Sequence, residues 1–503
     1  MWEVLNRMIY REYYKKFSAN DNEEVLQFVP NSDAEGFLFE NAPRLYCPDE
    51  VIQETFAFRT WTMRKHIKKT ESGFLITEFL TNEQIPWAGK YNTINTALTH
   101  HLNEFRWFKN SDLFLDYIDF YINGAGSVKQ TACAFSYHTP ALTAIYNYCI
   151  LTANEQFMID NADALEEYFK IWEDRHLTEN GLYWSTDDRE GTEFTISGTT
   201  SDLKMLKGFR PLMNSCMYGD AVSLSKIESL KGNYDKEKYY LDKARFIKDQ
   251  INQKMWDGTF YKAIHPIDQE LNKSVDYSDI PAECNARELM GYIPFAYNAA
   301  DQNRCEIFRL LKDDSVFLTK TGLATADISN KRFLYYKDRP CSWNGFVWPY
   351  ATSYVINAVI EVLNNYNQNV ITDLDLYDYV KQYAKMHYSN EDGKIINFID
   401  EVMLPYEYVW YARQKFKSAT TKVAGGHNRG RDYNHSTFID LVLRGLCGVS
   451  VDENSIKVEP KIRSIWKWFK IENLTIRKQT YNVFYDEDGS VFNKGKGVIL
   501  ERV

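Results

Sequence analysis

The segments PALTAIYNYCILT (140–152) and EQFMIDNADALEEYFKIWE (155–173) carry apolar residues three and four positions apart. This spacing is typical of two amphipathic helices joined by a short turn. Similar pairs recur along the chain, separated by loops that hold Gly, Pro, Asn and Asp. The other helices are expected at 93–107 and 113–122, 212–230 and 236–255, 285–299 and 302–311, 348–364 and 374–386, and 436–446, the last member of a less clear sixth pair. About six helix pairs without a fixed repeat period predict a mainly α fold, an (α/α)6 toroid, rather than an open solenoid.

The pattern changes on both sides of this helical region. Residues 1–55 contain Pro30, Pro43 and Pro48, which break long helices, and they predict an N-terminal extension. Residues 56–448 form the expected catalytic domain. Residues 449–503 carry β-branched and aromatic residues with partial alternation, and they predict a small β-rich C-terminal element. Its strands are expected at 455–460, 469–477, 479–485 and 498–503, with a hairpin turn at 486–489.

Composition narrows the classes of function that the protein can have. The net charge of −10 argues against nucleic acid as the main partner, because phosphate binding needs a basic surface. The 35 Tyr, 30 Phe and 12 Trp residues make up 15% of the chain, and aromatic rings pack on the C–H faces of sugars. The sequence contains no run of about 18 apolar residues, so no membrane span is expected. The first residues lack the apolar core of a signal peptide. The chain is therefore expected in the cytoplasm, or in the periplasm if a leader was removed. The oligomeric state stays open.

The eight cysteines are scattered without CxxC spacing, so no zinc or redox site is expected. The loop GLYWSTDDREGTEFTISG (181–198) is the richest in candidate catalytic groups, with Asp187, Asp188, Glu190 and Glu193 close in sequence to Tyr183 and Trp184. Clustered carboxylates raise one another's pKa, which suits a general acid that stays protonated near neutral pH. A solvated acidic loop is the alternative interpretation.

Other polar and aromatic groups gather in four short segments. Ile399-Asp400-Glu401 precedes GGHNRGRDYNHST (425–437), where Asn434 or Ser436 can also serve as a helix N-cap. The segments CSWNGFVWPY (341–350) and IPWAGKYNTIN (85–95) interleave aromatic and turn residues ahead of helices. We expect these segments to line a sugar-binding cleft, and core packing at helix starts is the alternative.

Three of these segments resemble known proteins. WNGFVWPYATS (343–353) resembles the WxGPxW motif of (α/α)6 glycosidases such as trehalases, mannosylglycerate hydrolases and processing α-glucosidases, with Phe346 where the motif has Pro. EGTEFTIS (190–197) resembles their general-acid signature, with Glu193 in place of the usual Asp. RDYNHSTFIDLVLRGLCGV (431–449) looks like the end of the barrel in trehalase-like glycosidases. The resemblance extends over about residues 55–450.

The resemblance implies a glycoside hydrolase that inverts the anomeric configuration with two carboxylates and a water molecule. It implies no metal and no organic cofactor. Glu193 is the expected general acid, with Asp187 and Asp188 as fallback candidates. Glu401 is the expected general base, with Glu407 as its rival. The expected sugar-binding residues are Trp87, Tyr91, Tyr137, His138, Trp184, Asp188, Arg210, Trp343, Trp348, Tyr433 and His435.

Two other functions fit the same toroid. A sugar isomerase or epimerase would use histidines as acid and base, and the available ones are His66, His100, His101, His138 and His435. A non-catalytic carbohydrate-binding protein would keep the aromatic cleft without turnover, but carboxylates survive at both expected positions. The sugar, the linkage and the anomer cannot be read from the sequence.

Overall fold

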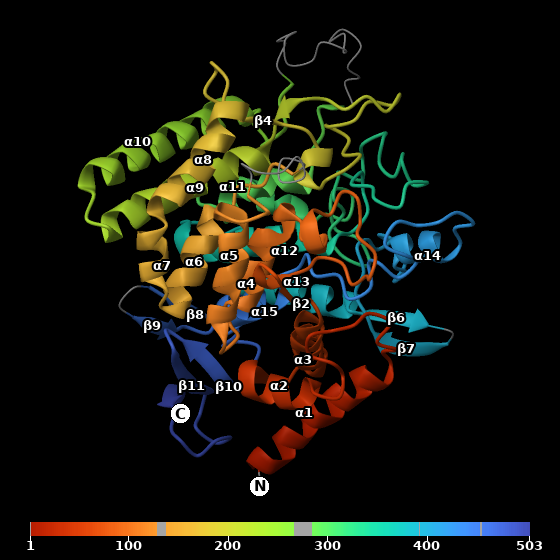
Figure 1. The fold of residues 1–503 in the computed structure, drawn as a ribbon, viewed down its shortest axis with the longest axis vertical. Coiled ribbons are helices and arrows are strands. Elements are labelled where there is room, and N and C mark those ends of the chain that lie inside the picture. Colours follow the sequence, from red (N-terminus) through yellow and green to blue (C-terminus); the bar gives the residue numbers. More distant parts are fainter. Residues whose placement is uncertain (1, 128–136, 266–283, 392, 453–454) are drawn as a thin grey trace.

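The computed structural model describes residues 2–127, 137–265, 284–391, 393–452 and 455–503. Helices dominate the fold, and a four-stranded sheet lies at the end of the molecule where both termini are found (Figure 1). Among the described residues, no helix is both long and apolar enough to cross a membrane.

Six helical segments form a closed series of contacts. Each segment packs against the next one, and the sixth packs back against the first. We call these segments the inner helices. They are α4 (Leu98–Phe105), α6 (Leu142–Thr152), α9 (Pro211–Leu230), α11 (Ile293–Ala296), α12 (Pro349–Asn365) and α15 (Phe438–Asp440), which continues as a π-helical turn at Leu441–Leu446.

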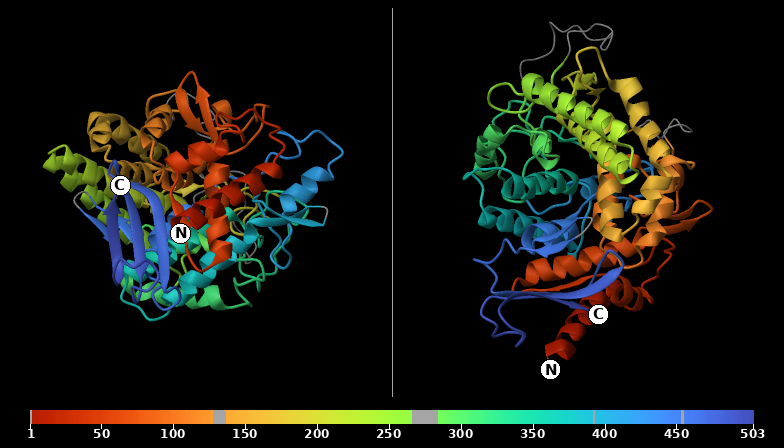
Figure 2. Two further views of the ribbon diagram at one scale, coloured as in Figure 1. Left: turned by 90° about the horizontal axis from the view of Figure 1, so that it is seen from below. Right: turned by 90° about the vertical axis from the view of Figure 1, so that its left-hand side faces the viewer.

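A second group of helices packs on the inner ones. The contacts join α3 to α15, α8 and α10 to α9, and α13 to α12, while α5 packs against α8. The views in Figures 1 and 2 show α8 and α10 beside α9. These helices are α3 (Glu50–Lys65), α5 (Leu115–Ile122), α8 (Ala162–His176), α10 (Tyr234–Gln250) and α13 (Asp373–Met386).

Local sequence explains where several of these helices begin. The Asp49 carboxylate accepts hydrogen bonds from the first backbone N–H groups of α3, as an N-cap does. Thr372 and Asp375 form a reciprocal capping box at the start of α13. Pro211 and Pro349 occupy the first turns of α9 and α12, where a missing N–H costs nothing.

The expected helices and the observed ones differ most at residues 285–312. Instead of one helix over 285–299, the chain forms a 3₁₀ turn at Leu289–Tyr292 and then the single turn of α11. Asn298 has a φ of 60°, in the left-handed region, and this conformation ends the helix. The expected helix at 302–311 is a 3₁₀ helix, Gln302–Lys312. The expected helix at 155–173 is divided into α7 (Glu155–Asp160) and α8.

The four-stranded antiparallel sheet joins segments from both ends of the sequence (Figure 2). Leu45 lies opposite Ile471, and the buried Arg44 guanidinium lies 3.3 Å from the Glu472 carboxylate. The N-terminal helices α1 (Trp2–Ala19) and α2 (Ala34–Asn41) pack on α3 beside this sheet. The strands, in sheet order, are β1 (Arg44–Tyr46), β10 (Trp468–Ile476), β11 (Gln479–Asp486) and β12 (Gly497–Arg502).

Four two-stranded ribbons connect the helices, and three of them lead directly into site loops. β2–β3 (Ile67–Thr70, Gly73–Ile76) precedes Glu78, and β6–β7 (Tyr388–Glu391, Lys394–Asn397) precedes Glu401. β4–β5 (Trp184–Ser185, Gly208–Phe209) encloses the acidic loop. The remaining elements are β8–β9 (Val449–Val451, Ile456–Val458) and α14 (Tyr411–Lys417).

Candidate active site

A cavity of about 580 Å³ lies where several inner helices begin. Thr96 precedes α4, Tyr137 precedes α6, Trp348 precedes α12, and Tyr433 and His435 precede α15. The remaining lining comes from loops that follow strands or turns: Glu78, Phe79, Trp87, Ile94, Gly191, Glu193, Phe194, Arg339, Pro340, Cys341, Glu401 and Arg429. Both carboxylates expected from the sequence therefore face the same cavity.

The loop that carries Glu193 is organised by the buried carboxylate of Asp187. Its Oδ2 accepts hydrogen bonds from the backbone N–H of Thr195 at 3.0 Å, from the Thr195 hydroxyl at 3.1 Å and from the Thr199 hydroxyl at 2.8 Å. Its Oδ1 accepts from the N–H of Asp188 at 2.8 Å. A Cβ on Gly198 would lie 2.5 Å from this carboxyl group, so only glycine fits there. Asp187 lies behind the loop and does not line the cavity.

Arg210 also supports this loop from behind. Its Nε donates to Oε2 of Glu190 at 2.9 Å, and its Nη1 donates to the Ser197 hydroxyl at 3.3 Å. Ser197 in turn donates from its N–H (3.0 Å) and hydroxyl (2.6 Å) to Glu288. Burying a guanidinium is costly unless its donors are satisfied. Arg210, selected from the sequence as a sugar-binding residue, therefore has its donors directed into the protein.

Glu193 has the environment of a protonated acid. Burial, together with the nearby carboxylates of Asp187, Asp188 and Glu401, raises its pKa to about 8. The carbonyl of Glu193 accepts a hydrogen bond from the N–H of Trp343 at 3.0 Å. This bond connects the acidic loop to the WNG segment, 150 residues further along the chain.

Glu401 is fixed on the other side of the cavity. The carboxylate of the preceding Asp400 accepts from the N–H of Glu401 at 2.7 Å, and a Cβ on Gly430 would lie 2.0 Å from that carboxylate. The Cys341 thiol donates to Oε2 of Glu401 at 3.4 Å. Nε of Arg429 lies 3.7 Å from Oε1.

The electrostatics of Glu401 differ from those of Glu193. Burial and the Glu78 carboxyl raise the pKa of Glu401, whereas the Arg429 guanidinium lowers it. Arg429 is held by aromatic rings, with its guanidinium carbon 4.4 Å from the ring centre of Phe416 and 5.0 Å from that of Trp87. Glu401 thus has a fixed cation beside it. The rival Glu407 is exposed and does not line the cavity.

Aromatic side chains form much of the remaining wall. Trp87, Tyr137, Trp348 and Tyr433 line the cavity, as does His435. Trp343 lies one layer deeper, where it stacks on Trp348 with ring centres 4.6 Å apart and an interplanar angle of 19°. Burial lowers the pKa of His435 to about 3, so this imidazole is neutral near pH 7.

Four other residues selected from the sequence lie outside the lining. His138 and Trp184 pack together, with ring centres 5.7 Å apart, because His138 turns toward the Ser185 hydroxyl at 3.0 Å. Asp188 accepts from the Thr186 hydroxyl at 2.6 Å. The Tyr91 ring packs under the ammonium of Lys90 at 4.7 Å.

Sequence analysis did not select Glu78, Arg339, Cys341 or Arg429, although all four line the cavity. Arg429 stands in the polar segment 425–437, whose density of hydrogen-bonding groups was a usable signal. Glu78 and Arg339 carry no comparable signal, because Glu78 is a single charged residue in its loop and Arg339 follows Lys337 and Asp338 in a charged run without other polar motifs.

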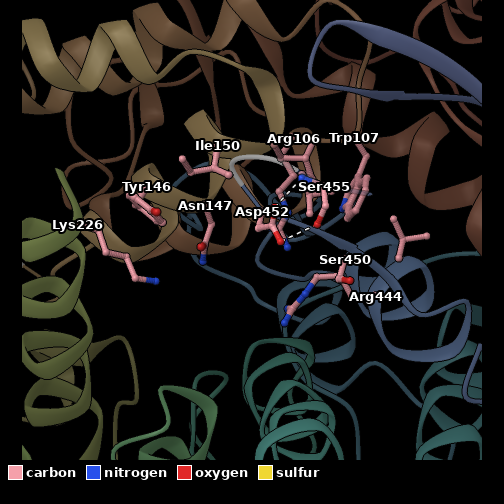
Figure 3. A pocket seen from close by; sticks show the side chains of 13 residues that line it. Arg106, Trp107, Tyr146, Asn147, Ile150, Lys226, Arg444, Ser450, Asp452 and Ser455 are labelled. Carbon is pink, nitrogen blue, oxygen red and sulfur yellow. Dashed lines mark hydrogen bonds between the residues drawn. The ribbon is translucent and has the colours of Figure 1, made fainter. Parts of the chain in front are cut away.

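A second cavity, also of about 580 Å³, lies at the opposite ends of the inner helices (Figure 3). Its lining includes Ile150 and Leu151 near the end of α6 and Lys226 near the end of α9. Arg444 at this cavity is paired with Glu361 and Asp440, and Asp452 is the one carboxylate among the described residues that line the cavity. The first cavity holds both carboxyls expected from the sequence, so it is the candidate active site.

Solved structures of carbohydrate-active enzymes share the fold. A protein titled "Sialidase" is 27% identical with a TM-score of 0.86, and the match covers 99% of this chain and 43% of that one. The GH78 rhamnosidase of Bacillus sp. GL1 is 12% identical with a TM-score of 0.57, covering 89% of this chain and 40% of that one. The α-L-rhamnosidase of Dictyoglumus thermophilum is 14% identical with a TM-score of 0.50, covering 89% and 43%. The chain thus spans less than half the length of these proteins. No curated protein sequence matches it.

A family model identifies the type of domain that makes up most of this chain. Residues 90–436 match the mannosylglycerate hydrolase MGH1-like glycoside hydrolase domain. The match confirms the resemblance to (α/α)6 glycosidases that the motifs at 190–197 and 343–353 indicated. Since it covers more than half of the sequence, the chain belongs to the family of mannosylglycerate hydrolase MGH1-like glycoside hydrolase domains.

Proposed function

We propose that this protein hydrolyses a glycosidic bond with inversion, using Glu193 as general acid and Glu401 as general base. The observation that carries the proposal is that both carboxyls line one cavity in different electrostatic environments. Pairs of titratable groups whose surroundings separate their pKa values are the usual mark of an acid and a base. The family supports hydrolysis of glycosidic bonds in general, and the stereochemistry is our inference.

In this mechanism Glu193 donates its proton to the oxygen of the leaving group as the glycosidic bond breaks. Glu401 takes a proton from a water molecule, which attacks the anomeric carbon from the opposite face of the sugar. Inverting enzymes hold the two carboxyls about 6.5–9.5 Å apart so that the water fits between. The two protons balance, because one is given to the leaving group and one is taken from water.

The cavity suits a sugar. Its volume falls within the range of about 300–1,000 Å³ found for small-molecule sites. Trp87, Tyr137, Trp348 and Tyr433 present rings to it, and aromatic rings pack on sugar C–H faces. Of the five histidines considered for an isomerase, His435 alone is among the described lining residues, which favours carboxylates as the proton carriers.

We also infer that the fold is an (α/α)6 toroid. Support comes from the closed contact order of the six inner helices and from the outer helices packed on them. The domain boundaries near residues 56 and 448 remain our proposal. The sheet shared by β1 and β10 places the two flanking segments together at one end of this ring.

The direct test is a panel of glycosides incubated with the protein. It should contain aryl α-mannosides, mannosylglycerate, aryl α-L-rhamnosides and aryl sialosides, because these correspond to the names of the similar proteins. We expect turnover of at least one compound and proton NMR detection of the inverted anomer as first product. Retention would refute the mechanism, and glycan binding without turnover would indicate a carbohydrate-binding protein.

A further inference from the structure

A third carboxyl lies in the wall of the candidate active site. Glu78 follows β3, and its backbone N–H donates to the carbonyl of Asn92 at 3.3 Å, which fixes the residue at the cavity. The side chain is only about 5% exposed. Its Oε1 lies 3.3 Å from Nδ1 of His435, another lining residue.

The second oxygen of Glu78 is buried without a hydrogen bond from the described residues. No described protein group reaches Oε2 within hydrogen-bond geometry, although the Tyr433 hydroxyl and the Arg429 guanidinium are near enough to favour the ionised form. A buried polar atom without a hydrogen bond costs on the order of 1–3 kcal/mol. Such atoms are rare in native proteins and call for a specific explanation.

Buried carboxyls outside the cavity differ in how their oxygens are occupied. Glu228 and Oδ2 of Asp220 accept no hydrogen bond from the described residues, whereas Glu104 and Glu190 have both oxygens occupied. Glu104 accepts from the N–H groups of Ile439 and Asp440, both at 3.1 Å, one with each oxygen. Glu190 accepts from Nε of Arg210 with Oε2 and from the N–H of Met213 with Oε1. Neither Glu104 nor Glu190 lines the cavity. Glu78 differs from them both in its open oxygen and in its position.

We infer that Glu78 is a substrate-binding residue whose Oε2 forms a hydrogen bond with a hydroxyl group of the sugar held between Glu193 and Glu401. The inference rests on the proposed function only in placing a sugar in this cavity. A hydroxyl matches the site because it can donate to a carboxylate or accept from a carboxylic acid. Burial raises the pKa of Glu78 to about 8, so both forms are within reach near neutral pH.

Glu78 is a poorer candidate for the base than Glu401. Burial raises the pKa of both groups, but Glu401 has the Arg429 guanidinium at 3.7 Å and the Cys341 thiol at 3.4 Å to stabilise its ionised form. Glu78 has the neutral imidazole of His435 beside its Oε1 at 3.3 Å. If Glu78 were the base instead, the experiment described below would give a different result.

The experiment measures binding of free monosaccharides, so it does not depend on turnover. Calorimetric titrations with D-mannose, L-rhamnose, D-glucose and N-acetylneuraminic acid compare the natural protein with Glu78→Ala and Glu78→Gln. Glu83→Ala is the matched control, because Glu83 lies in the same loop, is about half exposed and pairs through its side chain with the exposed Lys422. A thermal melt of each variant checks folding.

We expect the sugar that binds most tightly to lose about 3- to 100-fold in affinity in Glu78→Ala, a range that spans one hydrogen bond to a neutral carboxyl and one to a carboxylate. Glu78→Gln, which keeps an oxygen and an amide at this place, should recover part of the loss, and Glu83→Ala should bind normally. One monodeoxy analogue of that sugar should bind the natural protein and Glu78→Ala equally, since the same hydrogen bond is already missing.

Three results would overturn the inference: no sugar binding by the natural protein, equal binding by Glu78→Ala, or normal binding with a loss of kcat in both Glu78 variants. The last would make Glu78 the base. The proposed hydrolase activity fails on a different result, which is the absence of turnover across the glycoside panel while Glu78-dependent sugar binding persists.

Discussion

Nε of Arg429 lies 3.7 Å from Oε1 of Glu401. The guanidinium is held between the rings of Phe416 and Trp87, and it also donates to the carbonyl of Ala424 at 3.2 Å. A cation fixed in this way stabilises the ionised form of one carboxyl of the cavity. Glu193 has carboxylates as its charged neighbours instead, so the effect of burial is opposed by a cation at Glu401 and reinforced by like charges at Glu193.

Replacing Arg429 should change the pH at which the base ionises. Because the guanidinium lowers the pKa of Glu401, Arg429→Met should raise that pKa. The base works when ionised, so the acidic limb of kcat/KM should move to higher pH. Lys422→Met, which removes an exposed cation from a nearby loop, is the control. An unmoved acidic limb in Arg429→Met would contradict the pairing.

The pH profile of the natural protein should be bell-shaped. Glu193 works when protonated, and its pKa is raised to about 8, so kcat/KM should fall as the pH rises through about 8. Glu401 works when ionised, and its pKa is raised above the ordinary value of 4.5, so activity should fall as the pH decreases toward that range. Initial rates from pH 4 to 10 test this. An activity that keeps rising beyond pH 9 would exclude Glu193 as the acid.

Glu193→Gln should separate substrates by their leaving groups. A general acid contributes typically 10²–10⁴-fold, and it matters most when the leaving oxygen needs a proton. We therefore expect a loss of about 10²-fold or more on alkyl glycosides and a much smaller loss on dinitrophenyl glycosides. With the dinitrophenyl glycosides, kcat/KM of this variant should no longer fall as the pH rises through about 8. Equal losses on both substrate types would assign the proton to another group.

The two candidates for the base can be distinguished by matched substitutions. Glu401→Gln removes the carboxylate that lines the cavity, so turnover should fall by about 10²-fold or more whatever the leaving group. Glu407→Gln changes an exposed side chain six residues further along, and it should retain near-normal kcat and KM. Normal activity in Glu401→Gln together with a loss in Glu407→Gln would reverse the assignment.

The sequence predicted features that depend on local pattern. Trp348 lies at the cavity because Pro349 starts α12, and this order of residues is visible in the WNGFVWPY segment. Glu193 stands out because the loop that carries it resembles a known signature. The direction in which a side chain points was harder to predict from the sequence. His138 follows the lining residue Tyr137, yet its ring turns toward Ser185 and Trp184.

Contacts between residues far apart in the chain could not be predicted from the sequence. Glu78 contacts His435 across 357 positions, and this contact exists only because the β2–β3 ribbon and the segment before α15 reach the same wall. The pairing of Leu45 with Ile471 likewise joins the N-terminal and C-terminal segments, which the sequence presented as separate elements. Periodicity and motif spacing carry no information about such contacts.

The last prediction concerns Asp187, whose carboxylate holds the loop of the proposed acid. Its Oδ2 accepts three hydrogen bonds, from Thr195 N–H, Thr195 Oγ1 and Thr199 Oγ1. Asp187→Asn must place its amide nitrogen either against these three donors or against the N–H of Asp188, which donates to Oδ1. We expect a loss of about 2–3 kcal/mol in unfolding free energy, because hydrogen bonds to charged groups contribute about 1.5–3 kcal/mol each.

Turnover should fall together with stability in Asp187→Asn, since Glu193 lies on the same loop. Asp188→Asn is the matched control, because Asp188 is partly exposed and bonds the Thr186 hydroxyl next to it. Gly198→Ala should reproduce the Asp187→Asn phenotype without changing any charge, because its Cβ would lie 2.5 Å from the Asp187 carboxyl. Denaturant unfolding and initial rates measure both effects. If Asp187→Asn loses turnover at full stability while Gly198→Ala remains active, Asp187 acts on the substrate chemically and the supporting role assigned to it is wrong.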